Sequence, residues 1–162
     1  MNNQDYYFEF SDNVNITTDL LEYALIDIGY NLGPYKGFYL KPVNYNILVK
    51  DPLLKKLILT KGYVGSAIFR MTPNSCYNWH KDGNRTVTVN LLLNNVESHC
   101  YFHDESENLM KQYCEVPYHP NRIYALNVQK EHIVFNGQDV RYVFGMSFNC
   151  IEYDTFKNFF LE

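Results

Sequence analysis

The chain has 162 residues, a formal net charge of −4 and 46% hydrophobic residues. This length fits one ordinary domain, residues 1–162, and the hydrophobic fraction is large enough for a substantial core. The slightly acidic charge, without basic clusters, argues against nucleic acid as a partner. No apolar run approaches the roughly 20 residues of a membrane helix, and the first residues do not resemble a signal peptide. We therefore expect a cytoplasmic protein that is not embedded in a membrane.

The cysteines follow no disulfide or zinc-binding pattern. There are four of them, Cys76, Cys100, Cys114 and Cys150, and none forms a CxxC pair. A chain of this length does not need disulfides in order to fold. We predict that they are free thiols that act as small hydrophobic side chains.

Residues 1–62 are predicted to form an α/β support region. Helix-capping residues mark its helices: Thr17 or Thr18 at the start of the first, with Gly29 closing it, and Asp51-Pro52 at the start of the second. The two helices are expected at residues 17–28 and 51–59, and two short strands, at residues 6–10 and 38–40, alternate with them.

From residue 63 onward the composition favours β-strands. Segments rich in Val, Ile, Tyr, Phe and Thr alternate with turn residues. The expected strands lie at residues 63–71, 85–93, 99–103, 114–118, 122–128, 133–135 and 140–149. Many short strands at close spacing are typical of a sandwich or barrel. We predict a mainly β fold with a jelly-roll-like core over residues 63–149, N-terminal helices packed on one sheet, and a short helix within residues 150–162.

One metal-site hypothesis starts from His80-Lys81-Asp82. On an extended segment, residues i and i+2 share a face, so His80 and Asp82 converge while Lys81 points away. A histidine from another strand would complete a two-His, one-carboxylate triad, which leaves three positions open on a six-coordinate iron. His132, in a later β-rich segment, is the third ligand that we expect.

A competing motif lies at His103 and Glu105. His99 would share a strand face with His103, so a second histidine pair exists there, but it has no obvious third ligand. The residues after His103 are acidic and read as an exposed loop. We predict that His103 and Glu105 are dispensable for metal binding.

Arg141 begins the most β-like segment of the chain. Alternation places Arg141 on one face together with the small or apolar residues Val143, Gly145 and Ser147. The bulky side chains of residues 142, 144, 146 and 148 face the other way, where they can pack beneath the helices. A guanidinium among such neighbours needs a partner, and two alternatives stay open: the carboxylate of a bound dicarboxylate, or a structural glutamate.

The ordered set of His80, Asp82, His132 and Arg141 on a β-core resembles the Fe(II)/2-oxoglutarate-dependent dioxygenases. The likeness covers about residues 63–149. It implies a double-stranded β-helix, a jelly-roll or cupin-like fold that holds the metal and the cosubstrate inside one end of the barrel.

Two branches of that superfamily are similar. Residues 80–102 look like the corresponding part of prolyl-hydroxylase-like members, and residues 117–126 look like the strand–turn–strand before their second metal histidine. Residues 131–136 with Arg141 are also similar to the aspartyl/asparaginyl-hydroxylase-like branch. That branch typically lacks the carboxylate ligand, which Asp82 supplies here.

The resemblance implies a cofactor set and a reaction. His80, Asp82 and His132 would hold Fe(II) as the catalytic metal site, and Arg141 would pair with the distal carboxylate of 2-oxoglutarate. O₂ is the other cosubstrate, succinate and CO₂ are the products, and ascorbate is an accessory reductant. The iron supplies the oxidative chemistry, while the protein supplies positioning and exclusion of water.

Four further residues bear on the cosubstrate and substrate. Asn90 and Tyr124 are placed where they could hydrogen-bond the cosubstrate, although each also fits a satisfied polar group of the core. Arg85 would either meet the substrate or lie on the barrel rim. Many members of the superfamily have a serine two residues after the arginine, and Val143 stands there instead, which weakens the expectation for 2-oxoglutarate more than that for iron.

The substrate is expected to be a peptidyl prolyl, aspartyl or asparaginyl side chain, with a small molecule as the next choice. Its selection would depend on the N-terminal helices and on residues 72–79 and 104–113. Two rival functions stay open. One is a non-catalytic jelly-roll binding or structural module, and the other is a cupin-type metalloenzyme that does not use 2-oxoglutarate.

Overall fold

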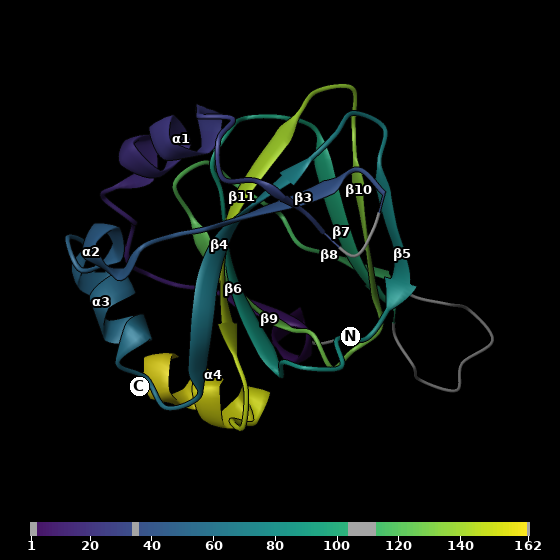
Figure 1. Ribbon diagram of the computed structural model, residues 1–162. Helices are drawn as coiled ribbons and strands as arrows, with labels where there is room; N and C mark the ends of the chain where they lie inside the picture. The colour runs from purple at the N-terminus through teal and green to yellow at the C-terminus, as the bar shows by residue number, and fades with distance from the viewer. Residues whose placement is uncertain (1–2, 34–35, 104–112, 162) are drawn as a thin grey trace.

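The computed structural model describes residues 3–33, 36–103 and 113–161, which form two antiparallel β-sheets that face each other (Figure 1). The large sheet has the strand order β1-β9-β6-β11-β4-β3-β2, and the small sheet has the order β5-β10-β7-β8. In the large sheet the strands are β1 (Tyr7–Glu9), β2 (Asn31–Leu32), β3 (Phe38–Pro42), β4 (Tyr63–Met71), β6 (Val87–Leu92), β9 (Ile123–Asn127) and β11 (Arg141–Phe148). In the small sheet they are β5 (Cys76–His80), β7 (Ser98–His103), β8 (Tyr113–Glu115) and β10 (His132–Asn136).

Strand β11 is the centre of the large sheet, and its alternation is the one predicted. It pairs with β4 on one side and with β6 on the other. Phe144, Met146 and Phe148 are fully buried in the core on the outer face of the sheet. Arg141 and Val143 point to the opposite face, toward the small sheet, where they line a cavity. One strand therefore supplies both the core and the inner wall of the barrel.

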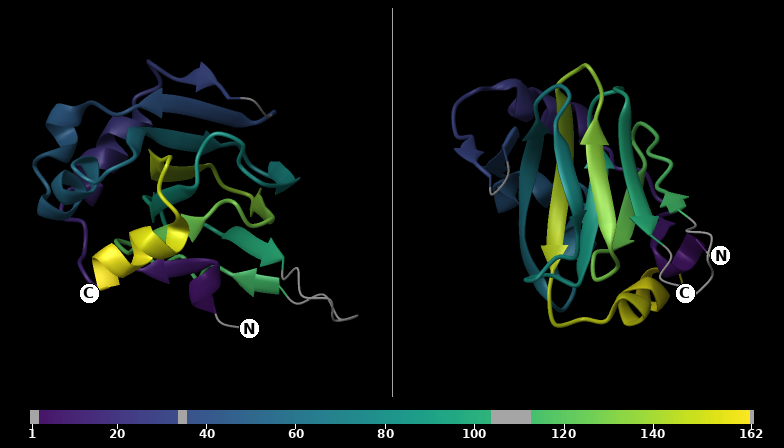
Figure 2. Two further views of the ribbon diagram at one scale, coloured as in Figure 1. Left: turned by 90° about the horizontal axis from the view of Figure 1, so that it is seen from below. Right: turned by 90° about the vertical axis from the view of Figure 1, so that its right-hand side faces the viewer.

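Helices cover the outer face of the large sheet, as predicted, and leave the small sheet on the other side (Figure 2). Besides a 3-10 turn (Asn3–Asp5), the helices are α1 (Thr17–Leu25), α2 (Tyr45–Leu48), α3 (Pro52–Ile58) and α4 (Tyr153–Leu161). Leu20 of α1, Leu54 of α3 and Phe156 of α4 are completely buried in one cluster with the strand residues. Burial of a side chain of this kind contributes about 1.5–3 kcal/mol.

The helix boundaries show where capping rules hold and where they do not. Asp51 is the N-cap of α3, and its carboxylate accepts from the backbone N–H of Leu54 at 3.0 Å, as predicted. In contrast, the N-cap position of α1 is Ile16, whose side chain cannot cap, and the Thr17 hydroxyl donates to the carbonyl of Val14. This helix also ends at Leu25, four residues before Gly29.

Four elements of the structure were not predicted from the sequence, and two of them are the 3-10 turn at Asn3–Asp5 and strand β2. Strand β5 lies in the segment expected to be a polar loop, and the short helix α2 precedes α3. The predicted strand at residues 114–118 is shorter, since β8 ends at Glu115. The four cysteines are free, as predicted. No helix among the described residues is long and apolar enough to cross a membrane.

Candidate metal and cosubstrate site

A cavity of about 610 Å³ lies between the two sheets. The large sheet lines it with inward-facing residues of β3, β4, β6 and β11, and the small sheet with residues of β5, β7 and β10. His80, Asp82 and His132 line this cavity together with Arg141. The structure therefore brings to one cavity the four residues that the sequence singles out.

The pairing of β5 with β10 brings the two histidines together. His80 ends β5, His132 begins β10, and the two are direct cross-strand partners whose ring centroids are 4.1 Å apart. Asp82 follows β5 and is held by its backbone N–H, which donates to the carbonyl of Val128 at 2.9 Å. One ligand atom from each of the three side chains lies within 4.8 Å of the others.

The hydrogen bonds of the two histidines prepare them to bind a metal. Nδ1 of His80 lies 2.6 Å from the carbonyl of Asn78, and Nδ1 of His132 lies 2.9 Å from the carbonyl of Lys130. A carbonyl only accepts, so Nδ1 carries the proton in each ring and Nε2 presents its lone pair. Burial lowers the pKa of both rings, that of His132 to about 4, which keeps the imidazoles neutral as metal ligation requires.

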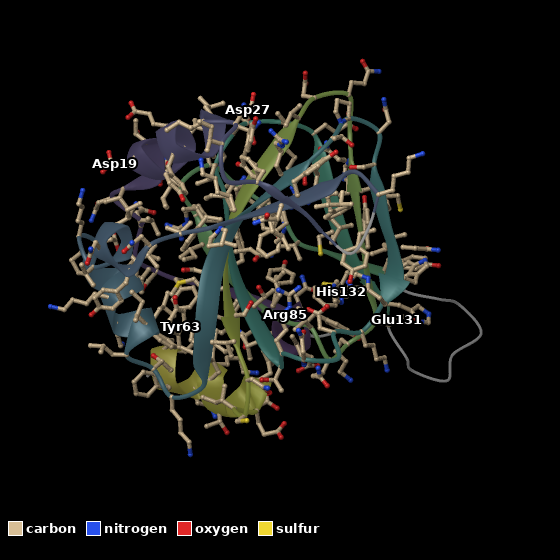
Figure 3. All side chains as sticks on the ribbon, viewed as in Figure 1. Asp19, Asp27, Tyr63, Arg85, Glu131 and His132 are labelled. Atoms are coloured by element: carbon tan, nitrogen blue, oxygen red, sulfur yellow. The ribbon has the colours of Figure 1, made fainter. Side chains whose placement is uncertain are left out.

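These donors fit a first-row metal. Two neutral imidazoles and one carboxylate form the ligand set of non-haem Fe(II) oxygenases, with bonds of about 2.0–2.2 Å. The triad is therefore consistent with an Fe(II) site. Figure 3 shows Arg85 and His132 close together between the two sheets. Arg85 donates from Nε to Oδ2 of Asp82 at 2.5 Å, so it belongs to the site rather than to the barrel rim.

Arg141 is almost completely buried, with 3% of its surface exposed. Its guanidinium lies 5.3 Å from the centre of the Tyr118 ring, and Nη1 lies 3.3 Å from the sulfur of Met71. Its Nε has no hydrogen-bond partner, and no carboxylate of the described residues forms an ion pair with it. Burial lowers its pKa, although an arginine stays charged. The structural glutamate that the sequence left open is therefore not found in the described part of the chain.

Of the other predicted cosubstrate residues, Asn90 lines the cavity and Tyr124 does not. The amide of Asn90 donates to the Tyr118 hydroxyl at 3.2 Å. Tyr124 is opposite Asn90 on β9, but it is completely buried and its hydroxyl donates to the carbonyl of Pro117 at 2.7 Å. Tyr124 thus matches its alternative interpretation, a satisfied polar group of the core.

Tyr118 is a cavity residue that sequence reasoning missed. It follows β8 in an irregular segment, where strand periodicity gives no direction for its side chain. Burial raises the pKa of its hydroxyl, which therefore stays protonated and can donate a hydrogen bond. The only signal in the sequence was its place in the segment that resembles prolyl hydroxylases.

The competing histidines do not form a metal site in the described residues. Nδ1 of His103 lies 3.3 Å from Glu131, and His99 contacts Glu115 at 2.7 Å and Glu97 at 3.3 Å. These pairs belong to outward-facing side chains, and the metal-compatible cluster found among the described residues is the triad above. Glu105 lies outside the described residues.

Solved structures share this architecture. The chain matches a prolyl hydroxylase from Trichoplax adhaerens, solved with a peptide fragment of the oxygen degradation domain of hypoxia inducible factor, with a TM-score of 0.69 and 12% identity over 91% of this chain and 84% of that one. It matches a Pseudomonas putida prolyl-4-hydroxylase with a TM-score of 0.63 and 14% identity over 88% and 91% of the two chains. The chain has the fold of the 2-oxoglutarate- and Fe(II)-dependent oxygenases.

This fold is the double-stranded β-helix that the sequence resemblance implied. HygX from Streptomyces hygroscopicus, solved with nickel, 2-oxoglutarate and hygromycin B, also matches, with a TM-score of 0.61 and 10% identity over 88% of this chain and 81% of that one. The matched structures thus include prolyl hydroxylases as well as HygX with hygromycin B bound, so the branch within the fold is not resolved. By sequence, no family model and no curated protein matches the chain.

Proposed function

We propose that the chain is an Fe(II)- and 2-oxoglutarate-dependent oxygenase that hydroxylates a peptidyl side chain or a small molecule. The observation that carries the proposal is one cavity lined both by a His-Asp-His triad and by a buried arginine that has no carboxylate partner among the described residues. A metal centre alone is common to many enzymes. The buried guanidinium adds a recognition group for a dicarboxylate, which a cupin that does not use 2-oxoglutarate has no need for.

In this proposal His80, Asp82 and His132 hold the iron. Bound Fe(II) would supply the oxidative chemistry that converts 2-oxoglutarate, O₂ and a substrate C–H into succinate, CO₂ and an alcohol. The hydrogen bonds to Nδ1 orient both imidazoles, and burial keeps them neutral. Ascorbate would serve as the reductant that returns the iron to Fe(II).

At the other end of the cosubstrate, Arg141 would bind the distal carboxylate through two parallel N–H bonds. The Tyr118 hydroxyl lies beside the guanidinium and stays protonated, so it can donate a third hydrogen bond to the same carboxylate. Val143 lies on the inner face beside Arg141 and is 4% exposed. The serine that many superfamily members have at that position is thus replaced by an apolar wall, and Tyr118 is the side chain we propose in its role.

Two matched structures support the two proposed substrate classes, a peptidyl side chain and a small molecule. The Trichoplax adhaerens enzyme was solved with a peptide and HygX with a small molecule, so both classes suit this fold. The net charge of −4 does not favour nucleic acid. The cytoplasmic location expected from the sequence stays part of the proposal.

The proposal is tested by product formation. Purified protein loaded with Fe(II) and supplied with 2-oxoglutarate, ascorbate and air should release one succinate for each 2-oxoglutarate consumed, slowly even without a substrate. The His132→Ala variant should release none above background. A protein that binds iron yet never releases succinate would be a cupin-type enzyme. A protein that binds neither iron nor 2-oxoglutarate would be a non-catalytic module.

A further inference from the structure

The two carboxylate oxygens of Asp82 face different neighbours. Its Oδ2 accepts a hydrogen bond from Nε of Arg85 at 2.5 Å, whereas its Oδ1 lies 3.7 Å from Nε2 of His80. The Asp82 side chain is only 5% exposed, so water offers little competition for either oxygen. One oxygen is therefore committed to the arginine, and the other faces the metal-binding nitrogen.

Arg85 is itself held in place. Its Nη1 donates to the hydroxyl of Ser147 at 3.3 Å, on the inner face of β11 that also carries Arg141. The amide of Gln129 donates to the backbone carbonyls of both Asp82 and Arg85, at 2.8 and 2.7 Å. The backbone segment between the two residues is thus braced at both ends, and the guanidinium cannot leave Oδ2 without also losing its hydrogen bond to Ser147.

We infer that Arg85 is a positioning residue that restricts Asp82 to one metal-binding oxygen, Oδ1. The inference rests on the proposed function and deepens it. Carboxylates bind metals through one oxygen or through both. With one oxygen, a two-His, one-carboxylate triad leaves three positions on a six-coordinate metal, enough for a two-point chelate and O₂. With both, only two positions stay open, so the chelate and O₂ could not bind together.

Charge and geometry both contribute to this role. A charge-assisted hydrogen bond is roughly twice as strong as a neutral one, so Oδ2 strongly prefers Arg85. Without Arg85, Oδ2 would lose its charged hydrogen-bond donor on a side chain that is only 5% exposed, and turning onto the metal would replace that contact. The sequence left two roles open for Arg85, contact with the substrate or a place on the barrel rim. The inference assigns it to the metal centre instead.

The test counts water molecules on bound Mn(II), which replaces Fe(II) without oxidising in air. Broadening of the Mn(II) electron paramagnetic resonance spectrum in ¹⁷O-water reports the number of coordinated waters. We expect three waters in the unaltered protein, with two displaced by 2-oxoglutarate. Arg85→Met should show two waters before 2-oxoglutarate is added and none after it. Arg85→Lys, which keeps a cation within reach of Oδ2, should restore the third water.

The matched control is Arg70→Met. Arg70 forms an ion pair with Asp27 at 2.7 Å on the outside of the protein, so this variant deletes the same kind of contact away from the cavity and should keep three waters. If Arg85→Met does not fold, Arg85→Gln removes the charge while keeping a polar group, and it should also show two waters. Three waters in a folded Arg85→Met or Arg85→Gln variant would overturn the inference and leave the proposed function intact. An unaltered protein that binds no Mn(II), or from which 2-oxoglutarate displaces no water, would instead contradict the proposed function.

Discussion

Arg141 differs from the other arginines of the chain in its surroundings. The remaining three each pair with a carboxylate: Arg70 with Asp27, Arg85 with Asp82, and Arg122 with Glu9. Arg141 is the most deeply buried of the four, yet its Nε has no hydrogen-bond partner. Because a buried charge without a partner is costly, a residue of this kind is better explained by ligand binding than by stability.

Replacing Arg141 should therefore affect the cosubstrate and not the metal. We expect Arg141→Ala to weaken 2-oxoglutarate binding about ten- to a hundred-fold, since a charge-assisted hydrogen bond contributes about 1.5–3 kcal/mol. Arg141→Lys should recover part of that loss, because the charge stays but the planar fork is lost. Calorimetric titration of Mn(II)-loaded protein with 2-oxoglutarate measures both. Unchanged binding in Arg141→Ala would mean that the arginine is structural.

Substitutions in the two histidine pairs distinguish the proposed metal site from the competing one. His132→Ala should abolish metal binding, because it removes one of three converging ligands. His103→Ala should leave metal binding unchanged, because His103 faces Glu131 on the outer side of the small sheet. Equilibrium dialysis against Mn(II) compares the two variants directly. If His103→Ala loses metal binding and His132→Ala keeps it, the metal site has been assigned to the wrong histidines.

The direction of a single side chain was most clearly predictable where a regular strand carried the residue. Arg141 lies on β11, whose alternation is strict, so its inward direction followed from the sequence. Tyr118 follows the end of β8, and the same reasoning gave it no direction. Tyr124 was expected either to contact the cosubstrate or to be a satisfied polar group of the core, and its hydroxyl bonds to the backbone of Pro117, a contact that no periodicity encodes.

At the scale of elements, central strands were predicted well and edge strands unevenly: β1 lies within its predicted range, whereas β2 and β5 were not predicted. The predicted bounds of β4 match the structure, since the strand lies between β3 and β11 and is rich in β-forming residues. Strand β5 pairs only with β10, at the edge of the small sheet, and its alternation is broken by a register shift. Its Asn and Cys residues favour loops when taken alone. Tertiary pairing outweighs that weak local preference.

The connection between α3 and β4 depends on Gly62. This residue has a φ of +89°, and a Cβ there would lie 2.1 Å from the carbonyl oxygen of Asn149. Gly62→Ala should therefore lower the free energy of unfolding by about 2 kcal/mol or more. Gly65 is the matched control, because a Cβ at Gly65 meets nothing within 4 Å, so Gly65→Ala should change stability by less than about 1 kcal/mol. Urea denaturation of both variants gives the comparison, and equal stabilities would contradict this view of the connection.

At the scale of the whole molecule, the proposed binding of metal and cosubstrate in one cavity would couple ligand binding to stability. The three metal-ligand candidates lie at one end of the β5–β10 pair, and Arg141 comes from the other sheet, so a metal and a cosubstrate bound together would link the two sheets. A ligand that binds only the folded state stabilises it by about 2.7 kcal/mol at a hundred-fold excess over its Kd. The layering that creates this cavity followed from the many short strands of the sequence, whereas its volume and lining depend on packing that the sequence does not show.

Thermal unfolding should report this coupling. We expect saturating Mn(II) with 2-oxoglutarate to raise the Tm by roughly 5–10 °C for a chain of this size, and a chelator to reverse the rise. In Arg141→Ala the contribution of 2-oxoglutarate should be lost while that of the metal is kept. A 2-oxoglutarate contribution to the Tm that is unchanged in Arg141→Ala would show that the cosubstrate binds elsewhere.

The central claim is that Fe(II) and 2-oxoglutarate occupy this one cavity together, and an anaerobic titration tests it most directly. Adding 2-oxoglutarate to the Fe(II)-loaded protein should produce the weak visible charge-transfer band of a keto acid chelated to iron, which saturates at one equivalent. The band should be absent in His132→Ala and should need a higher 2-oxoglutarate concentration in Arg141→Ala. Fe(II) binding without any such band in the unaltered protein would contradict the account.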